Sequence, residues 1–168
     1  MATYTLISSN VLSSSAASVT FSSIPATYTD LVVRWSARCS TTTENVDIQL
    51  NAASTSYSIT QVDGYGSSGT ASSRSTTDPG IRVYGMTQSG DTANTFGSAE
   101  FYLPNYAGST NKPNSTFAVT ETNATQALIQ AVAGLRSNTD AVTSLKLQTG
   151  SGNFVSGSSF YLYGISNA

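Results

Sequence analysis

The alternation of apolar and polar residues between Asp30 and Cys39 constrains the fold more than any other feature of the sequence. Apolar side chains occupy every odd position of this stretch, and Arg34 and Arg38 fall between them. A period of two is typical of a half-buried β-strand, because successive side chains point to opposite faces. The odd face carries Trp35, the only tryptophan, and therefore predicts a second apolar layer packed against it in a β-sandwich.

Similar short strands recur along the whole chain. No segment shows the apolar period of an amphipathic helix, and turn-forming residues separate about ten strands, a spacing typical of a sandwich or jelly roll. The predicted strands cover residues 3–7, 18–22, 30–39, 46–50, 57–62, 81–86, 98–103, 116–121, 127–136, 141–148 and 158–165. Within 127–136, Gly134 marks either a bulge or a close approach of another group to the backbone.

A length of 168 residues suits one folded domain. Residues 1–17 are predicted to form an N-terminal arm with the first strand, and residues 18–168 a single β-sandwich domain. Two polar stretches, 63–80 and 87–97, lack apolar periodicity and are predicted to be long loops. The first is expected to be an exposed tip, and its candidate binding residues are Asp63, Tyr65, Arg74 and Asp78.

The charge content excludes several classes of partner. Charged residues make up 10% of the chain, against about 25% in an average globular domain. The seven Lys and Arg residues are scattered among nine acids, so no nucleic-acid-binding surface is expected. No apolar run reaches the ~18 residues of a membrane-spanning helix, so no membrane partner is expected either.

A surface rich in hydroxyl groups and tyrosines favours packed protein contacts. Ser and Thr make up about a third of the chain, and there are nine tyrosines, which offer rigid contact area. Sandwich proteins also protect their strand edges, either by oligomerising or by using polar edge strands, and the sequence leaves both possibilities open. Candidate contact residues are Tyr4, Leu6, Tyr102 and Tyr106, although tyrosines also fill ordinary sandwich edges.

The residues needed for most catalytic sites are missing. The chain has no histidine, which excludes Ser-His-Asp and Cys-His catalysis. Its single cysteine, Cys39, lies on the predicted core face and is interpreted as a buried apolar residue. Paired carboxylates remain as a route to glycoside cleavage, with Glu44 and Asp47 or Glu100 and Glu121 as candidates. Each is better explained as a solvent-facing or ion-paired residue, so no catalytic, cofactor or metal site is predicted.

Three stretches of the sequence carry a family resemblance. They read FSSIPATYTDLVVRWSAR at 21–38, AEFYLPNYAGSTNKP at 99–113 and AVTSLKLQTGSGNFVSGSSFYLYGI at 141–165. They resemble small virion structural proteins of tailed bacteriophages, abundant among phages of cyanobacteria and other aquatic bacteria, and similar modules of tail fibres. The resemblance implies a jelly-roll β-sandwich that assembles as a homotrimer on the outside of a virion.

The function implied by this resemblance is that of a capsid decoration or cement protein. A trimer bound to the major capsid protein would add contact area that must be broken before the shell opens. The alternative is a tail-fibre or receptor-binding tip domain whose loops contact a glycan or protein of the host surface. The amino terminus has no basic residue and no long apolar run, so we expect the chain to be made in the host cytoplasm and to reach the virion by assembly.

Overall fold

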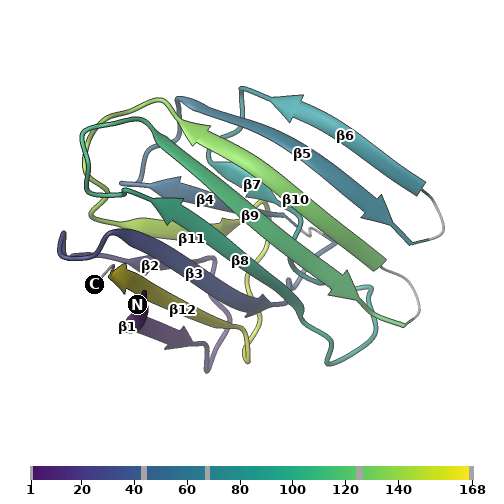
Figure 1. The fold of residues 1–168 in the computed structure, drawn as a ribbon. Coiled ribbons are helices and arrows are strands. Elements are labelled where there is room, and N and C mark those ends of the chain that lie inside the picture. The colour runs from purple at the N-terminus through teal and green to yellow at the C-terminus, as the bar shows by residue number, and fades with distance from the viewer. Residues whose placement is uncertain (1, 43–44, 67–68, 124–126, 167–168) are drawn as a thin grey trace.

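The computed structural model describes residues 2–42, 45–66, 69–123 and 127–166, and this part of the chain forms twelve β-strands and no helix (Figure 1). The strands are β1 (Thr3–Val11), β2 (Ser18–Phe21), β3 (Asp30–Ala37), β4 (Val46–Leu50), β5 (Tyr57–Tyr65), β6 (Gly69–Ser75), β7 (Ile81–Val83), β8 (Gly97–Pro104), β9 (Lys112–Glu121), β10 (Ala127–Arg136), β11 (Leu145–Thr149) and β12 (Ser159–Ser166).

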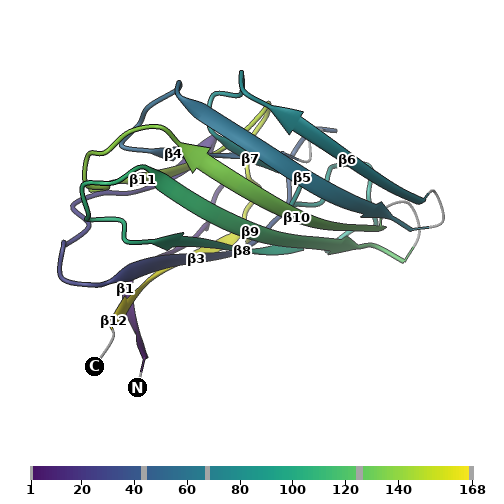
Figure 2. The same ribbon diagram turned by 45° about the horizontal axis from the view of Figure 1, so that its top comes forward.

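The strands form two antiparallel sheets that pack face to face. The larger sheet has eight strands in the order β1-β12-β3-β8-β9-β10-β5-β6, and the smaller has four in the order β2-β11-β4-β7. The smaller sheet lies behind the middle of the larger one, while β1 and β6 form opposite edges of the larger sheet (Figures 1 and 2). The predicted all-β sandwich is therefore confirmed, and its jelly-roll subtype stays a prediction.

The apolar face of β3 lies at the centre of the core, as its alternation predicted. Leu31 and Val33 are fully buried, and Trp35 is 2% exposed. The indole Nε1 of Trp35 donates a hydrogen bond to the carbonyl of Gly85 at 3.1 Å, so its one polar atom is satisfied. Cys39 is also fully buried, which confirms its interpretation as an apolar core residue.

The first strand is longer than the sequence indicated. The predicted strand ended at residue 7, but β1 continues to Val11 and pairs with β12 from Thr3↔Ser166 to Val11↔Ser159. A register shift between Leu6 and Ser8 marks a β-bulge in this pairing. Backbone pairing thus incorporates residues 8–11 into the large sheet, although the small polar side chains of Ser8, Ser9 and Asn10 carry no strand signal. The division of the chain at residue 17 stays a prediction.

The predicted loop at 63–80 is wrong, because most of its described residues form a β-hairpin, although residues 69–74 are exposed as expected and 67–68 lie outside the described residues. Residues 63–65 end β5, and β6 pairs with β5 from Ile59↔Ser75 to Tyr65↔Gly69. Strand β6 contains only Gly, Ala, Ser, Thr and Arg and is exposed on both faces. A strand without a buried face has no apolar alternation, so periodicity could not reveal it.

The second predicted loop, 87–97, contains no named strand until Gly97, where β8 begins, and it is held in place by Arg38. The guanidinium of Arg38 donates hydrogen bonds to the backbone carbonyls of four residues in this loop. The acceptors and N···O distances are Ser89 at 3.2 Å, Asp91 at 3.0 Å, Thr92 at 2.9 Å and Thr95 at 3.2 Å. One side chain therefore bonds four carbonyl groups of an irregular segment, of which those of Thr92 and Thr95 also accept hydrogen bonds from within the segment.

Gly134 makes a close approach and not a bulge. The pairing of β10 with β5 and β9 runs without a register shift through this residue. A Cβ atom at position 134 would lie 2.2 Å from Oδ1 of Asn114 and 2.7 Å from Cδ1 of Ile81. The absence of a side chain here lets these two residues pack against the strand.

Tyr57 links the start of β5 to the end of β4. Its hydroxyl accepts a hydrogen bond from the Leu50 N–H at 2.8 Å and donates to the Ala53 carbonyl at 3.3 Å. Burial raises the pKa of Tyr57 above its ordinary value of 10.0, against the opposing effects of the Leu50 hydrogen bond and the Arg136 charge. The phenol is therefore favoured in its neutral form in the folded chain.

We expect Tyr57→Phe to lower the free energy of unfolding by about 1–3 kcal/mol near pH 7, because the buried Leu50 N–H loses its acceptor. A raised folded-state pKa contributes stability that is fully present below the unfolded pKa of 10.0 and is lost as the pH rises through the folded pKa. The stability gap between wild type and variant should therefore narrow above about pH 10. Urea unfolding of both proteins across this pH range measures the gap, and a constant gap would contradict the prediction.

We expect Arg38→Ala to loosen the 87–97 loop without unfolding the sandwich. Amide hydrogen exchange at 89–95 should become at least about 10-fold faster, equivalent to about 1.4 kcal/mol of local opening free energy. Hydrogen-exchange mass spectrometry measures this rate. The matched control is Arg74→Ala on the exposed strand β6, which should leave exchange at 89–95 unchanged. Equal exchange in the two variants would show that Arg38 does not hold the loop.

Candidate functional site

The face of the large sheet that points away from the small sheet, called the outer face here, carries exposed apolar side chains. Phe117 on β9 is 54% exposed, Ile129 on β10 is 58% exposed and Val62 on β5 is 52% exposed. The register places Ala131 between Val62 and Phe117, and Ile129 opposite Val119. These five residues therefore form one contiguous apolar patch across three neighbouring strands.

This patch exists because β10 turns its more apolar side outward. The sequence groups Ala127, Ile129, Ala131, Ala133 and Leu135 on one face, and that face is exposed or half-buried. The opposite face points into the sandwich although it includes polar side chains; its members are Leu128, Gln130, Val132, Gly134 and Arg136. Exposed apolar side chains in central strands are not required by the fold, and such patches mark interaction sites.

Buried hydrogen bonds stabilise this orientation of β10. The amide of Gln130, which is fully buried, donates from Nε2 to the Asp63 carboxylate at 2.7 Å. Its Oε1 accepts a hydrogen bond from the Tyr84 N–H at 2.8 Å. Gln61 Nε2 donates to the same carboxylate at 2.8 Å. Each of these polar groups has a partner, so burying them does not leave an unpaired group.

Polar side chains also point inward at the other end of β9 and β10. Lys112 and Arg136 are opposite each other in register and are 0% and 6% exposed. The Lys112 ammonium donates to the carbonyls of Gly108, at 2.6 Å, and Thr110. Burial, and then the charge of Arg136, lower the pKa of Lys112. Arg136 is thus a neighbour of Lys112.

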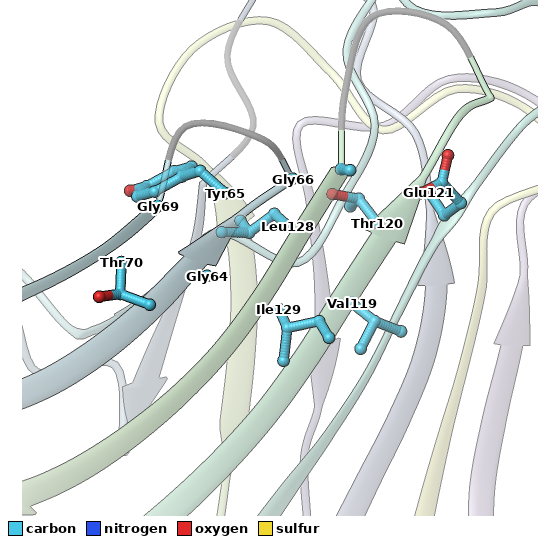
Figure 3. A pocket seen from close by; sticks show the side chains of 11 residues that line it. Gly64, Tyr65, Gly66, Gly69, Thr70, Val119, Thr120, Glu121, Leu128 and Ile129 are labelled. Atoms are coloured by element: carbon cyan, nitrogen blue, oxygen red, sulfur yellow. The ribbon is translucent and has the colours of Figure 1, made fainter.

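Two adjoining hollows lie along the patch. The larger, of about 560 Å³, lies at the ends of β5, β9 and β10 and is lined by residues that include Thr70, Val119 and Ile129. Figure 3 shows Val119 and Ile129 side by side on β9 and β10, with Gly64 and Thr70 beyond them. The smaller, of about 230 Å³, is lined by Arg34, Ser98, Ala99, Glu100, Phe117 and Val119. Val119 lines both, and together they are called the outer groove.

An exposed ion pair forms the polar end of the outer groove. Arg34 Nε lies 2.6 Å from Oε2 of Glu100, and the two side chains are 53% and 44% exposed. The hydrogen bond to Glu100 raises the pKa of Arg34, while partial burial acts in the opposite direction. The Arg34 guanidinium also lies 5.8 Å from the ring centroids of both Tyr4 and Tyr163. The groove therefore ends at a group with both donors and acceptors.

The carboxylates proposed from the sequence do not form a catalytic pair. Glu100 lies opposite Phe117, and Phe117 is four residues from Glu121 along β9. At about 3.3 Å per residue, the backbone positions of Glu100 and Glu121 are about 13 Å apart along the strand direction. Glycosidase carboxylates lie about 5–9.5 Å apart. The prediction of an ion-paired strand residue is confirmed for Glu100, with Arg34 as its partner. Glu121 instead accepts a hydrogen bond from the Asn123 N–H at 2.6 Å.

The other proposed pair is also not available for catalysis. Glu44 lies outside the described residues. The Asp47 side chain is 3% exposed and binds Arg82 at 2.9 Å. No group of three or more Cys, Asp and Glu residues lies together as a metal site in the described part of the chain. In that part, no helix is long and apolar enough to cross a membrane.

The four residues assigned to the exposed tip lie in different environments. Asp63 is 3% exposed, so its assignment as an exposed residue is wrong: its carboxylate accepts the buried hydrogen bonds described above. Asp78 is half-buried, and its carboxylate lies 2.6 Å from Nη1 of Arg82. Tyr65 is 40% exposed and lines the outer groove, and Arg74 is exposed on β6. Of the four, only Tyr65 reaches the groove.

The four proposed contact residues also separate into exposed and buried side chains. Tyr4 and Leu6 are 53% and 52% exposed on β1, where a partner could reach them. Tyr102 is half-buried and donates a hydrogen bond to the Asp30 carboxylate at 2.9 Å. Tyr106 is fully buried and donates to the Pro25 carbonyl, so it serves packing and cannot contact a partner. The contacts of Tyr4 and Leu6 stay predictions.

The fold and the groove define the class of the molecule as an all-β sandwich with an open, partly apolar sheet face. No protein-family model matches the chain, and a search of curated proteins finds no match either. Solved structures that match include the galectin LEC-6 of Caenorhabditis elegans, with 10% sequence identity and a TM-score of 0.38 over 95% of this chain and 96% of that one. CG-16, a homodimeric agglutinin from chicken liver, matches with 9% identity and a TM-score of 0.35 over 85% of this chain and 98% of that one.

These findings correct the function expected from the sequence. A virion structural protein was predicted, either a capsid decoration protein or a tail-fibre tip domain. The matched structures are a galectin and an agglutinin, and neither is a virion protein. The decoration and tail-fibre functions are therefore withdrawn. The three stretches that carry the phage resemblance specify strands and turns, and so they indicate a scaffold and not an activity.

We expect Arg34→Met to change the free energy of unfolding by less than about 1 kcal/mol, because the ion pair with Glu100 is exposed. Arg82→Met provides the comparison, because it leaves the buried Asp47 carboxylate without its main cation and should cost about 3 kcal/mol or more. Urea denaturation of both variants measures the two losses. A large loss of unfolding free energy in Arg34→Met would contradict the prediction and would show that the exposed ion pair stabilises the fold.

Proposed function

We propose that this chain is a non-catalytic binding domain and that its ligand is a saccharide chain lying across the outer face in the outer groove. The observation that carries the proposal is the exposed ring of Phe117 beside the Arg34–Glu100 ion pair. A sugar ring has an apolar C–H face and a rim of hydroxyl groups. The ring of Phe117 offers a surface for the first, and the ion pair offers donors and acceptors for the second.

The direction of the groove supports a chain-like ligand. Its lining extends from Arg34 on β3 to Thr70 on β6, across five steps between neighbouring strands. At about 4.8 Å per step, this distance is about 24 Å. An extended oligomer fits such a length better than a single small metabolite.

The charges of the groove argue against nucleic acid. Its lining contains one cation, Arg34, and two anions, Glu100 and Glu121. Arg34 is already paired, so no free cation in this lining is available to a phosphate backbone. The two anions would repel a phosphate backbone, whereas a neutral saccharide is not repelled by them.

The position of the groove argues against an extended peptide. Peptides that bind sheets usually add a strand at an edge, where backbone N–H and C=O groups are free. Most of the groove lies over β3, β8, β9, β10 and β5, which are paired on both sides, and only Gly69 and Thr70 of its lining belong to the edge strand β6. A ligand over these inner strands can use only side chains, which suits a hydroxyl-rich molecule.

We expect Phe117→Ala to weaken saccharide binding by at least about 10-fold, equivalent to about 1.4 kcal/mol, because the apolar sugar face loses its contact. Affinity electrophoresis through gels containing neutral or acidic polysaccharides first identifies a ligand for the wild type. Calorimetry with a short oligomer of that ligand then compares the variants. Phe117→Tyr should retain binding, because it keeps the ring.

The matched control is Thr20→Ala, which alters an exposed residue of β2 in the other sheet. This variant should bind like the wild type. Wild type that binds no polysaccharide, or Phe117→Ala that binds as tightly as Thr20→Ala, would exclude the proposal.

A further inference from the structure

Strand β1 forms one edge of the large sheet and has an unused pairing side. In the described residues β1 pairs only with β12, and eight of its nine residues are exposed. Its free side therefore presents backbone N–H and C=O groups that no other strand of the described chain pairs. Such an edge is a template for another strand.

The side chains of β1 do not protect this edge. The segment Thr3–Val11 contains no charged residue and no proline, which are the usual means of preventing edge pairing. Three of its exposed side chains are large and apolar: Tyr4 is 53% exposed, Leu6 is 52% exposed and Val11 is 60% exposed. The opposite edge, β6, differs, because it carries Arg74 and otherwise only Gly, Ala, Ser and Thr.

The β-bulge gives β1 a symmetric pattern of facing. Tyr4, Leu6, Ser9 and Val11 share the outer face, because their partners on β12 are Ile165, Tyr163, Tyr161 and Ser159. The bulge at Ile7 packs that side chain against the core, and Ser8 opposite Leu162 faces inward as well. From Ile7 back to Tyr4 the side chains therefore point inward, outward, inward and outward. From Ser8 forward to Val11 they follow the same order, so the strand is symmetric about the midpoint between Ile7 and Ser8.

We propose that two copies of this chain associate by antiparallel pairing of their β1 strands across a two-fold axis between Ile7 and Ser8. Side chains directly opposite each other in a sheet share a face, so an antiparallel self-pairing needs a facing pattern that is symmetric about its centre. The inward and outward directions of the β1 side chains meet this condition in one register. That register places Tyr4 opposite Val11 of the second copy, and Leu6 opposite Ser9.

Neighbouring registers violate the facing rule. A shift of one residue places Tyr4, which faces outward, opposite Asn10, which faces inward opposite Phe160. A shift of two residues again places Tyr4 opposite a residue that faces outward, Ser9. It also places Leu6, which faces outward, opposite Ile7, which faces inward. The bulge thus selects the register, and a second copy is the partner whose facing pattern necessarily matches.

Pairing in this register removes exposed apolar surface from water. Tyr4 and Val11 meet twice across the axis, with side chains directly opposite at about 4.5–5.5 Å between Cβ atoms. No charged side chain of β1 opposes the approach of the second copy. The two large sheets become one continuous sheet, and both outer grooves lie on the same face of the dimer. The dimer itself does not depend on the proposed saccharide ligand.

The test measures the mass in solution by size-exclusion chromatography with light scattering. Wild type at about 100 μM should have twice the chain mass of 17.4 kDa. Leu6→Glu should weaken the dimer by at least about 100-fold, because it places a carboxylate at the junction. The matched control is Val62→Glu, which alters a residue of equal 52% exposure on the same face but far from β1 and should remain a dimer.

A second variant tests the register itself. Adding Ser9→Lys to Leu6→Glu places a lysine opposite each glutamate, so the double variant should dimerise again. Circular dichroism confirms that each variant is folded. A monomeric or trimeric wild type, or a dimer that survives Leu6→Glu, would overturn the proposal. A double variant that stays monomeric would overturn the register.

Discussion

The buried amide of Gln130 determines how the large sheet presents its two faces. It donates to Asp63 and accepts from the backbone of Tyr84, so it joins β10 to β5 and to the residue after β7. Turning β10 over would break both hydrogen bonds and remove a partner from the Asp63 carboxylate and from the Tyr84 N–H. With Gln130 inside, Ile129 and Ala131 must face outward beside Phe117. The apolar patch and the outer groove therefore follow from one buried polar side chain.

The same orientation separates stability from binding. The core is formed by β3 and its neighbours, where Trp35, Phe101 and Phe160 are at most 2% exposed. The outer face contributes little to that core, so its residues are free to serve a ligand. The exposed Arg34–Glu100 pair fits this division, since ion pairs in water contribute little to stability. A binding function is consequently supported by side chains that the fold does not need.

The two edges of the large sheet differ in how readily they can pair with another strand. Strand β6 is polar on both faces, which limits its association with other strands. Strand β1 carries three apolar side chains on its outer face. Its bulge packs Ile7 against the core and also makes the alternation of inward and outward side chains symmetric along the strand. A local irregularity that improves packing within one chain thus also defines how a second chain can pair with it.

Alternation along the sequence was sufficient to predict the strands that surround the core. The odd positions of β3 are buried as predicted, and Ala99, Phe101 and Leu103 of β8 are buried in the same way. The hairpin strand β6 escaped prediction because both of its faces are exposed, and a strand without a buried face leaves no periodic signal. Phe117 was expected in a strand, but nothing in its neighbourhood distinguished it from a core residue.

The sequence by itself determined that this chain is a β-sandwich and that it contains no histidine, because period-two alternation and composition can be read directly from the chain. Only the tertiary structure decided which face is buried in strands that carry apolar residues on both faces. Alternation defines two faces and does not say which one turns inward when both carry apolar residues, as in β10. That choice depends on partners far apart in the chain, such as Gln130 and Asp63, which lie 67 residues apart. The location of the candidate site is therefore a property of the assembled sheets.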